Sequence, residues 1–467
     1  MVIVFALLAL TVLVTANWYV WRRLFRDTTR GPGWVRRTGA VVVAGGWVLT
    51  VTALIAERAG APFWLQRVLA WPGFLWMALS IYLLLGVVVG EVVRPLLRRV
   101  LERRDQRRAG ETATVRQRER VPAGAAEPVG VAESVPEPVP AGAGQSEPEA
   151  APKPPADPKS TATAGPSAQA AAEPSVPGGP GSEEPPRADE PATPSRRLFV
   201  SRVVAGAAAA AAVGTVGYGT YGVLRGPKVK RVTVPLAKLP RAAHGYRIAV
   251  VSDIHLGPVL GRGFARTVVD TINSTQPDLI AVVGDLVDGS VKDLGPAAAP
   301  LAQLRARHGT FFVTGNHEYF SGAEQWVEEV RRLGMRPLEN DRTEMPYFDL
   351  AGVNDIAGES EGQGPDFAKA LGDRDTARAC VLLAHQPVQI HDAVDHGVDL
   401  QLSGHTHGGQ LWPGNFVAQA ATPPLAGLER YGDTQLYVRR GAGAGGPPTR
   451  VGAPSDITVI ELASRQA

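Results

Sequence analysis

The sequence has few cysteines, a long stretch without aromatic residues and little net charge, and each of these excludes a class of protein or structure. It contains a single cysteine, Cys380, so an internal disulfide and a small disulfide-stapled fold are excluded. No aromatic residue occurs between Gly110 and Arg197, so that stretch cannot bury a hydrophobic core. The formal net charge of +3 over 467 residues is too small to indicate a nucleic-acid-binding protein. A chain of this length has room for roughly two to four structural units.

Charge is also absent from the apolar run Met1–Trp21. Two further apolar runs follow, Gly39–Ala56 and Pro72–Val93, and Glu91 is the one charged residue in the last of them. Each run approaches the ~20 residues that span a bilayer. Three buried helices of a soluble domain are the alternative, but such helices normally show a polar face. We therefore predict a transmembrane region of three helices over residues 1–110.

Arginines predict the orientation of these helices. Six lie between the first two runs and seven follow the third run, whereas the loop between the second and third runs has two, Arg58 and Arg67. Positively charged loops stay in the cytoplasm. The pattern predicts a multi-pass protein of the cell membrane with its N-terminus outside.

The middle of the chain predicts a spacer and an export signal. Residues 111–194 are mainly Ala, Pro, Gly, Glu and Ser, which predicts a disordered linker; a Pro-rich ligand for a partner protein is the alternative. The sequence Ser195-Arg196-Arg197-Leu198-Phe199 resembles a twin-arginine motif, and an uncharged stretch follows it. Residues 195–225 are thus either a twin-arginine-like signal, with the export machinery as a partner, or a fourth transmembrane helix. Both interpretations place the rest of the chain on the extracytoplasmic side.

From His244 onward, short runs rich in Val and Ile end in polar residues. We expect strands at Arg247–Asp253, Leu279–Asp285, Phe311–Asn316, Ala379–His385 and Leu400–His405. We expect helices at Arg262–Thr275, Pro300–His308, Ala323–Leu333 and Gly364–Leu371. This alternation favours an α/β domain, in which polar residues beyond the carboxyl ends of the strands converge. The converging set would be Asp253, His255, Asp285, Asn316, His317, His385, His405 and His407.

Five short motifs resemble, in order and spacing, the signature blocks of the calcineurin-like metallophosphoesterases. They are Asp253-Ile254-His255, Gly284-Asp285, Gly315-Asn316-His317-Glu318, Ala384-His385 and Gly404-His405-Thr406-His407. The last block continues as Gly408-Gly409-Gln410, which looks like the membrane-associated, exported subgroup of these proteins. The resemblance implies a four-layer α/β/β/α sandwich over residues 245–464, preceded by the all-α transmembrane region.

The resemblance also implies the roles of the polar residues. It assigns one metal ion to Asp253, His255 and His407, and a second to Asn316, His385 and His405. Asp285 would bridge both ions, and His317 would face the substrate as a proton donor or a phosphoryl-oxygen stabiliser. The mixed nitrogen and oxygen donors suit two divalent or trivalent transition-metal ions, Mn, Fe or Zn, better than Ca or Mg.

These features predict a membrane-anchored, metal-dependent phosphoesterase. Its substrate would be a phosphorylated small molecule or lipid with a phosphodiester, pyrophosphate or phosphomonoester bond. Similar family members include a hydrolase of UDP-diacylglucosamine, so we expect a lipid-linked or cell-envelope substrate. We expect no nucleic acid as a partner. The alternative is a non-catalytic membrane receptor or scaffold built on the same domain, and the intact ligand set argues against it.

Five further residues allow two interpretations each. Asp288 and Asp355 either contact the ligands or cap helices and turns. Arg450 either contacts the substrate phosphate or forms a surface ion pair. Trp412 and Phe416 either line a cleft for an acyl chain or pack in the core.

Overall fold

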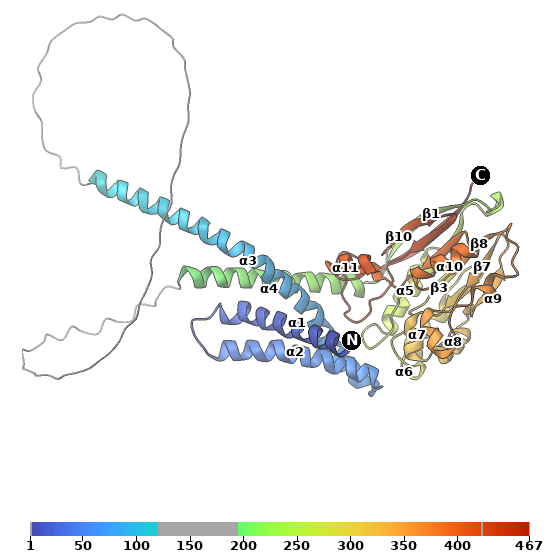
Figure 1. Ribbon diagram of the computed structural model, residues 1–467, viewed down its shortest axis with the longest axis horizontal. Helices are drawn as coiled ribbons and strands as arrows, with labels where there is room; N and C mark the ends of the chain where they lie inside the picture. The colour runs from blue at the N-terminus through green and yellow to red at the C-terminus, as the bar shows by residue number, and fades with distance from the viewer. Residues whose placement is uncertain (1, 120–194, 422–423, 467) are drawn as a thin grey trace, which may run out of the picture. The chain divides into compact units, whose positions relative to one another are not determined.

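The computed structural model describes residues 2–119, 195–421 and 424–466 (Figure 1). The chain divides into two compact units, one comprising Met1–Glu102 with Pro194–Ala467 and the other Arg103–Thr193. Most of the predicted linker lies outside the described residues. Its beginning is helical, because helix α3 (Phe63–Glu119) continues past the predicted boundary at residue 110. Residues 111–119 include no proline or glycine that would interrupt the helix.

The N-terminal part of the chain is helical, with α1 (Val2–Trp21), α2 (Trp34–Arg58) and α3 preceding α4 (Arg196–Leu224). Helices α2, α3 and α4 are long and apolar enough to cross a membrane. Their exposed faces carry large apolar side chains, such as Val41 at 70% and Val48 at 64% exposure. A helix that is apolar on both its packed and its exposed faces suits a lipid environment.

Small residues and one ion-pair network join these helices. A side chain at Gly46 of α2 would overlap the ring of Trp76 on α3, so glycine lets the two helices approach closely. Arg23, which follows α1, donates a hydrogen bond of 2.6 Å to Glu91 of α3. Glu91 also accepts a hydrogen bond of 2.6 Å from Arg94. The charges close to the apolar run of α3 are therefore paired with one another.

Two six-stranded sheets form the centre of the C-terminal region. The order of the first sheet is β1 (Lys228–Leu236), β12 (Asp456–Ser464), β2 (Tyr246–Val251), β3 (Leu279–Val283), β4 (Thr310–Val313) and β5 (Arg336–Pro337). The order of the second is β10 (Gly427–Tyr431), β11 (Thr434–Val438), β9 (Leu400–Ser403), β8 (Ala379–Leu383), β7 (Phe348–Gly352) and β6 (Asp341–Glu344). Strands β2 to β5 are parallel, as are β11, β9, β8 and β7, so each sheet has one edge where carboxyl ends meet.

Alternating residues of the strands build separate layers. In β2, Ile248 and Val250 enter the core between the two sheets, whereas Ala249 and Val251 face the helices on the outer side. Helices α5 (Arg262–Ser274), α6 (Val291–Ala298) and α8 (Ala323–Arg332) cover the first sheet, and α9 (Phe367–Leu371) and α10 (Ile390–Asp395) cover the second. The predicted four-layer α/β/β/α sandwich is confirmed.

One predicted helix of this domain is wrong. The segment Pro300–His308 contains only a short 3-10 helix, Ala299–Gln303, after which Leu304 is extended. The α-helix lies earlier, at α6, whose first turn is capped by Ser290 accepting a hydrogen bond from the backbone of Asp293. The prolines of this stretch divide it into two short pieces instead of one helix.

Candidate metal centre

The carboxyl ends of five strands bring the predicted ligands together. Asp253 and His255 follow β2, and Asp285 follows β3. Asn316 starts helix α7 (Asn316–Ser321) after β4, and the remaining histidines follow β8 and β9. Among the described residues, possible donor atoms lie within 4.8 Å of one another in three groups, and Asp285 belongs to two of them. The first group is Asp253, His255, Asp285 and His407, and the second is Asp285, His385 and His405. The third group, His255, Asp288 and His317, contains one predicted metal ligand.

In the first group, imidazole nitrogens face each other and two carboxylates. The Nε2 atoms of His255 and His407 are 2.9 Å apart. Oδ1 of Asp253 is 3.5 Å from Nε2 of His407, and Oδ2 of Asp285 is 3.8 Å from Nε2 of His255. These nitrogen and oxygen atoms are of the types that bind transition-metal ions, so a cation would find several donors close together here.

The second group contains a buried nitrogen in need of a partner. Nε2 of His385 lies 3.2 Å from Oδ2 of Asp285, yet it has no partner in hydrogen-bond geometry among the described residues. Its Nδ1 lies 2.9 Å from the carbonyl of Val283, which fixes the ring. Asn316 joins this group, because its Oδ1 is 3.0 Å from Nδ1 of His405. The donor set therefore fits a metal ion that Nε2 of His385 would bind.

Five of the seven predicted ligands have a left-handed backbone. The φ angles are 50° for Asp253, 50° for His255, 51° for Asp285, 73° for His405 and 52° for His407. Each such conformation of a non-glycine residue costs about 1–3 kcal/mol and persists only where the surroundings enforce it. Because such conformations cluster at functional sites, their presence at five residues of these loops indicates that the loops form a binding site.

The glycines before the ligands act in two ways. Gly284, Gly315 and Gly404 directly precede Asp285, Asn316 and His405, and Gly284 alone among the three has the left-handed backbone of a tight turn, with φ of 71°. Gly315 and Gly404 supply space instead. A side chain at Gly315 would overlap the carboxylate of Asp285, and one at Gly404 would overlap that of Asp253.

The electrostatics of the cluster favour bound positive charge. Burial would raise the pKa of Asp285, but the imidazoles of His385 and His255 outweigh burial and lower it well below its usual range. Burial would lower the pKa of His255, but the carboxylate of Asp288 outweighs burial and raises it to about 9. Burial lowers the pKa of His407 to about 3, which keeps this ring neutral and able to bind a metal.

Comparison with other proteins identifies the family. Residues 246–409 match the calcineurin-like phosphoesterase family. A metallophosphoesterase of Helicobacter pylori strain J99 is 37% identical over 272 residues, which are 58% of this chain and 73% of that protein. The chain belongs to the calcineurin-like metallophosphoesterases. A metallophosphoesterase of Bacillus subtilis is 30% identical over 285 residues, covering 58% of this chain and 98% of that protein.

The calcineurin-like metallophosphoesterases are a family of phosphoester hydrolases, and the Asp and His clusters of this chain suit the divalent metals of that family. A zebrafish protein described as a transmembrane protein with metallophosphoesterase domain is 39% identical over 260 residues, covering 52% of this chain and 59% of that protein. The chain thus spans less than two thirds of that relative. Together with the apolar helices, this similarity supports membrane association. The role of each ligand stays a prediction.

His317 lies at the edge of the cluster and is more exposed than the predicted ligands beside it. Its side chain is 34% exposed, whereas that of His255 is fully buried. Oδ1 of Asp288 lies 2.7 Å from Nδ1 of His317 and 2.8 Å from Nδ1 of His255. Of the two interpretations of Asp288, contact with the site is therefore the correct one. Asp355 instead caps a 3-10 helix, accepting a hydrogen bond of 2.8 Å from the backbone of Ala357.

Glu318 is a residue whose role the sequence did not reveal. Its buried carboxylate accepts hydrogen bonds from the backbone amides of Asp285 at 2.9 Å, Leu286 at 2.8 Å and Gly315 at 2.6 Å. It therefore joins the loops after β3 and β4, which carry Asp285 and Asn316. Burial, helped by the charge of Asp285, raises the pKa of Glu318 to about 7.

Arg450 does not form the surface ion pair that one of its two interpretations predicted. The residue is buried, and its guanidinium donates hydrogen bonds to the carbonyls of Gly443 at 2.6 Å and His407 at 3.0 Å. A further guanidinium nitrogen lies 3.0 Å from Nδ1 of His407. Arg450 thus positions a predicted metal ligand from a loop far along the sequence.

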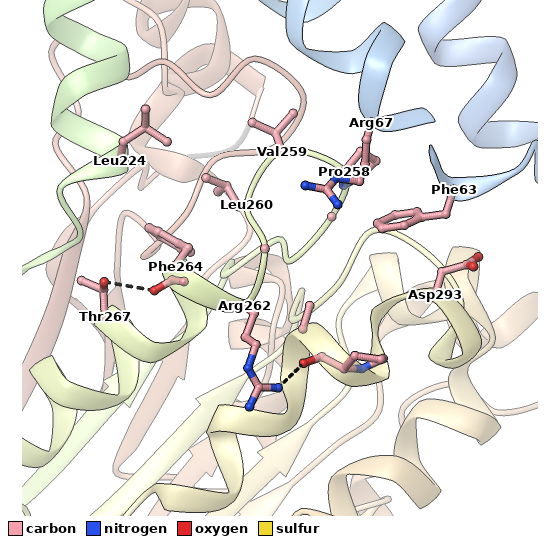
Figure 2. Close-up of a pocket in the computed structure, with 15 residues that line it drawn as sticks. Phe63, Arg67, Leu224, Pro258, Val259, Leu260, Arg262, Phe264, Thr267 and Asp293 are labelled. Carbon is pink, nitrogen blue, oxygen red and sulfur yellow. Dashed lines mark hydrogen bonds between the residues drawn. The ribbon is translucent and has the colours of Figure 1, made fainter. Parts of the chain in front are cut away.

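A separate cavity of about 630 Å³ is lined in part by the loop that follows His255 (Figure 2). Phe63 and Arg67 of α3, Leu224 of α4 and the loop from Gly257 to Leu260 line it, and no predicted metal ligand does. That loop starts two residues after His255. Helices of the apolar N-terminal part therefore meet a loop that is directly connected to a predicted ligand.

Proposed function

We propose that the chain is a two-metal phosphohydrolase with a lipid-linked or cell-envelope substrate. The observation that carries the proposal is the pair of Asp and His clusters that share Asp285. Asp253, His255 and His407 would hold one ion, and Asn316, His385 and His405 the other. Asp285 would contact both, which a carboxylate with two oxygens can do.

Two bound ions supply charge neutralisation for the phosphoryl oxygens and lower the pKa of a water nucleophile. The protein itself supplies position and a proton. Asp288 engages Nδ1 of His317 and so leaves Nε2 of that ring for the substrate. We propose that His317 donates a proton to the leaving group or stabilises a phosphoryl oxygen. Asp288 also lies 2.8 Å from Nδ1 of His255, so it would orient the His317 ring relative to a residue that would hold the first ion.

The direct test combines elemental analysis with an activity panel on the purified full chain. We expect about two transition-metal ions per chain, drawn from Mn, Fe and Zn, because the donors mix nitrogen and oxygen. We expect hydrolysis of at least one phosphodiester, pyrophosphate or phosphomonoester, and its loss on chelation. A chain that binds no transition metal and hydrolyses none of these esters would instead be a receptor or scaffold.

We propose in addition that the chain crosses the membrane several times and carries its catalytic domain on the extracytoplasmic side. The arginine distribution and the motif of Ser195, Arg196 and Arg197 support this orientation. A reporter that is active only outside the cytoplasm, fused after Leu462, should be active. Replacing Arg196 and Arg197 by Lys should reduce the signal if the twin-arginine route is used. An undiminished signal would favour an ordinary fourth transmembrane helix.

A further inference from the structure

The segment after the last predicted metal ligand carries no charge. From Gly408 to Leu428 the sequence contains no Asp, Glu, Lys or Arg. Helix α11 (Gly414–Ala421) and the turn before it expose 49% of Trp412, 63% of Phe416 and 75% of Val417. These exposures exclude the packed-core interpretation of Trp412 and Phe416. Grouped large apolar side chains on a surface mark a contact with a membrane or a partner.

The same segment lies against the helices that are apolar enough to cross a membrane. The hydroxyl of Tyr82 on α3 donates a hydrogen bond of 2.9 Å to the carbonyl of Trp412. Leu411 packs on a cluster from α3 and α4 that includes Ala78, Tyr82, Leu83, Ala212 and Val216.

The position of Tyr82 gives the depth of this contact. Tyr82 lies near the middle of the apolar run Pro72–Val93, about 15 Å from either end at 1.5 Å per residue. If that run crosses a bilayer, the backbone of Trp412 must lie within the hydrocarbon layer. An uncharged segment can occupy that layer, whereas charged side chains would be strongly destabilised there because they would lose their hydration.

A second loop of the catalytic domain reaches the same helices. The hydroxyls of Thr449 and of Thr220 on α4 are 2.7 Å apart and buried. Val451 packs on the cluster that Leu411 contacts, and its carbonyl accepts a hydrogen bond of 2.9 Å from the backbone of Trp412. Arg450 lies between Thr449 and Val451 in the sequence and donates a hydrogen bond to the carbonyl of His407. The contact with the apolar helices and the predicted metal centre are therefore parts of one connected structure.

We propose that Leu411–Ala420, the inserted segment, lies in the lipid bilayer with Trp412, Phe416 and Val417 covered by acyl chains. The inserted segment would present the metal centre to phosphoester lipids of the same membrane. This second statement rests on the proposed hydrolase function, whereas the first does not. Acyl chains fit as the occupant because the segment is uncharged and is continuous with apolar helices at the depth of Tyr82.

The insertion can be tested by site-directed spin labelling of the full chain in vesicles of phosphatidylcholine and phosphatidylglycerol. Cys380 is buried and is the only cysteine, so a Cys380→Ala background allows single labels. A nitroxide at Val417→Cys should collide more with oxygen than with a water-soluble nickel complex. A nitroxide at Glu429→Cys, exposed on β10, is the control and should collide more with nickel.

Two outcomes overturn the insertion. A label at position 417 that is as accessible to nickel as the label at 429 places the segment in water. A label that collides with neither reagent shows that protein, not lipid, covers it. An unfolded variant is recognised by loss of the immobilised spectrum at a third label on an exposed helix residue, such as Glu324→Cys on α8.

The proposal that the substrate is a membrane lipid is tested by measuring hydrolysis of a lipid and of a soluble ester by the same preparation. The probes are phosphatidic acid and phosphatidylglycerol in vesicles, and bis(4-nitrophenyl) phosphate in solution. Val417→Asp should lower the ratio of lipid to soluble hydrolysis by at least about tenfold, because a carboxylate resists transfer into lipid. Val417→Leu should keep the ratio of the unmodified chain.

The outcomes separate the two proposals. Hydrolysis of the soluble ester without hydrolysis of either lipid overturns the lipid substrate and leaves the hydrolase standing. No hydrolysis of any probe by the metal-loaded chain overturns the proposed function, while the spin-label result still decides the insertion. An equal ratio for Val417→Asp and Val417→Leu overturns the role of the inserted segment in lipid access.

Discussion

The apolar helices and the sandwich place different demands on their residues. On α2, Val41 and Val48 are largely exposed, and any large apolar side chain would serve there in lipid. In the sandwich, the carboxylate of Asp285 accepts a hydrogen bond from the backbone of His317, lies 3.2 Å from Nε2 of His385 and packs against Gly315, so its shape and charge are both constrained. The helices thus depend mainly on composition and on a few close contacts, whereas the metal centre depends on individual atoms.

The largest effect should come from the residue shared by the two clusters. Asp285→Asn replaces one carboxylate oxygen by an NH2 group, whose nitrogen does not bind metal ions. The side chain can then no longer hold both ions, so measurable phosphoester hydrolysis should be abolished. Elemental analysis should show a loss of bound metal. Asp270→Asn on the exposed face of α5 is the control and should retain both. Full metal content with normal turnover in Asp285→Asn would contradict the shared-ligand assignment.

The next effect concerns a group that would act on the substrate without binding metal. His317→Ala should lower the rate by roughly 10²–10⁴-fold, the usual contribution of one positioned acid–base group. Metal content should stay near normal. If His317 donates a proton, the defect should shrink for esters with nitrophenolate as leaving group. Equal defects for good and poor leaving groups would indicate phosphoryl-oxygen stabilisation, and loss of one metal would make His317 a ligand.

A smaller effect is expected where a buried side chain holds the loops of the site. Glu318→Gln places an amide donor against backbone N–H groups that now bind a carboxylate. One unsatisfied buried group costs about 1–3 kcal/mol, so thermal unfolding should occur at a lower temperature. Glu324→Gln on the exposed start of α8 should change nothing measurable. Equal unfolding temperatures for both variants would show that Glu318 does not stabilise the loops.

The smallest effect tests the helices and uses two adjacent glycines. A methyl group at Gly46 would overlap the ring of Trp76, whereas one at Gly45 meets nothing within 4 Å. Overpacking of this kind costs about 1–3 kcal/mol, less where the ring can shift. Gly46→Ala should therefore lower the unfolding temperature in detergent, and Gly45→Ala should not. Identical behaviour of the two variants would mean that α2 and α3 are not packed at Gly46.

The sequence pattern predicted an α/β domain and the gathering of polar residues because both depend on short-range patterns, whereas the four-layer sandwich was implied by the family resemblance. Runs of Val and Ile mark buried parallel strands, and the residues after them meet at one sheet edge. This reasoning located Asp253, Asp285 and His385 at the carboxyl ends of three different strands. It also predicted the apolar helices, although α3 continues to Glu119, past the predicted boundary at residue 110.

The remainder depended on contacts between distant segments. Glu318 binds backbone amides of two loops, one of which lies more than thirty residues earlier in the chain. Arg450 reaches His407 across 43 positions, so its spacing carries no recognisable signal. The choice between the two interpretations of Asp288 needed the positions of His255 and His317 in space. Such roles belong to tertiary structure and leave little trace in local sequence.

The left-handed backbone at five predicted ligands has a consequence for metal exchange. Those conformations are fixed by strands and hydrogen bonds of the protein, such as the amide of His405 donating to Asp253 at 3.0 Å. An ion would then meet ligands that are already ordered, unlike the small zinc domains that fold only when metal arrives. We expect chelators to strip the ions from a sandwich that stays folded, and a different divalent metal to enter without refolding.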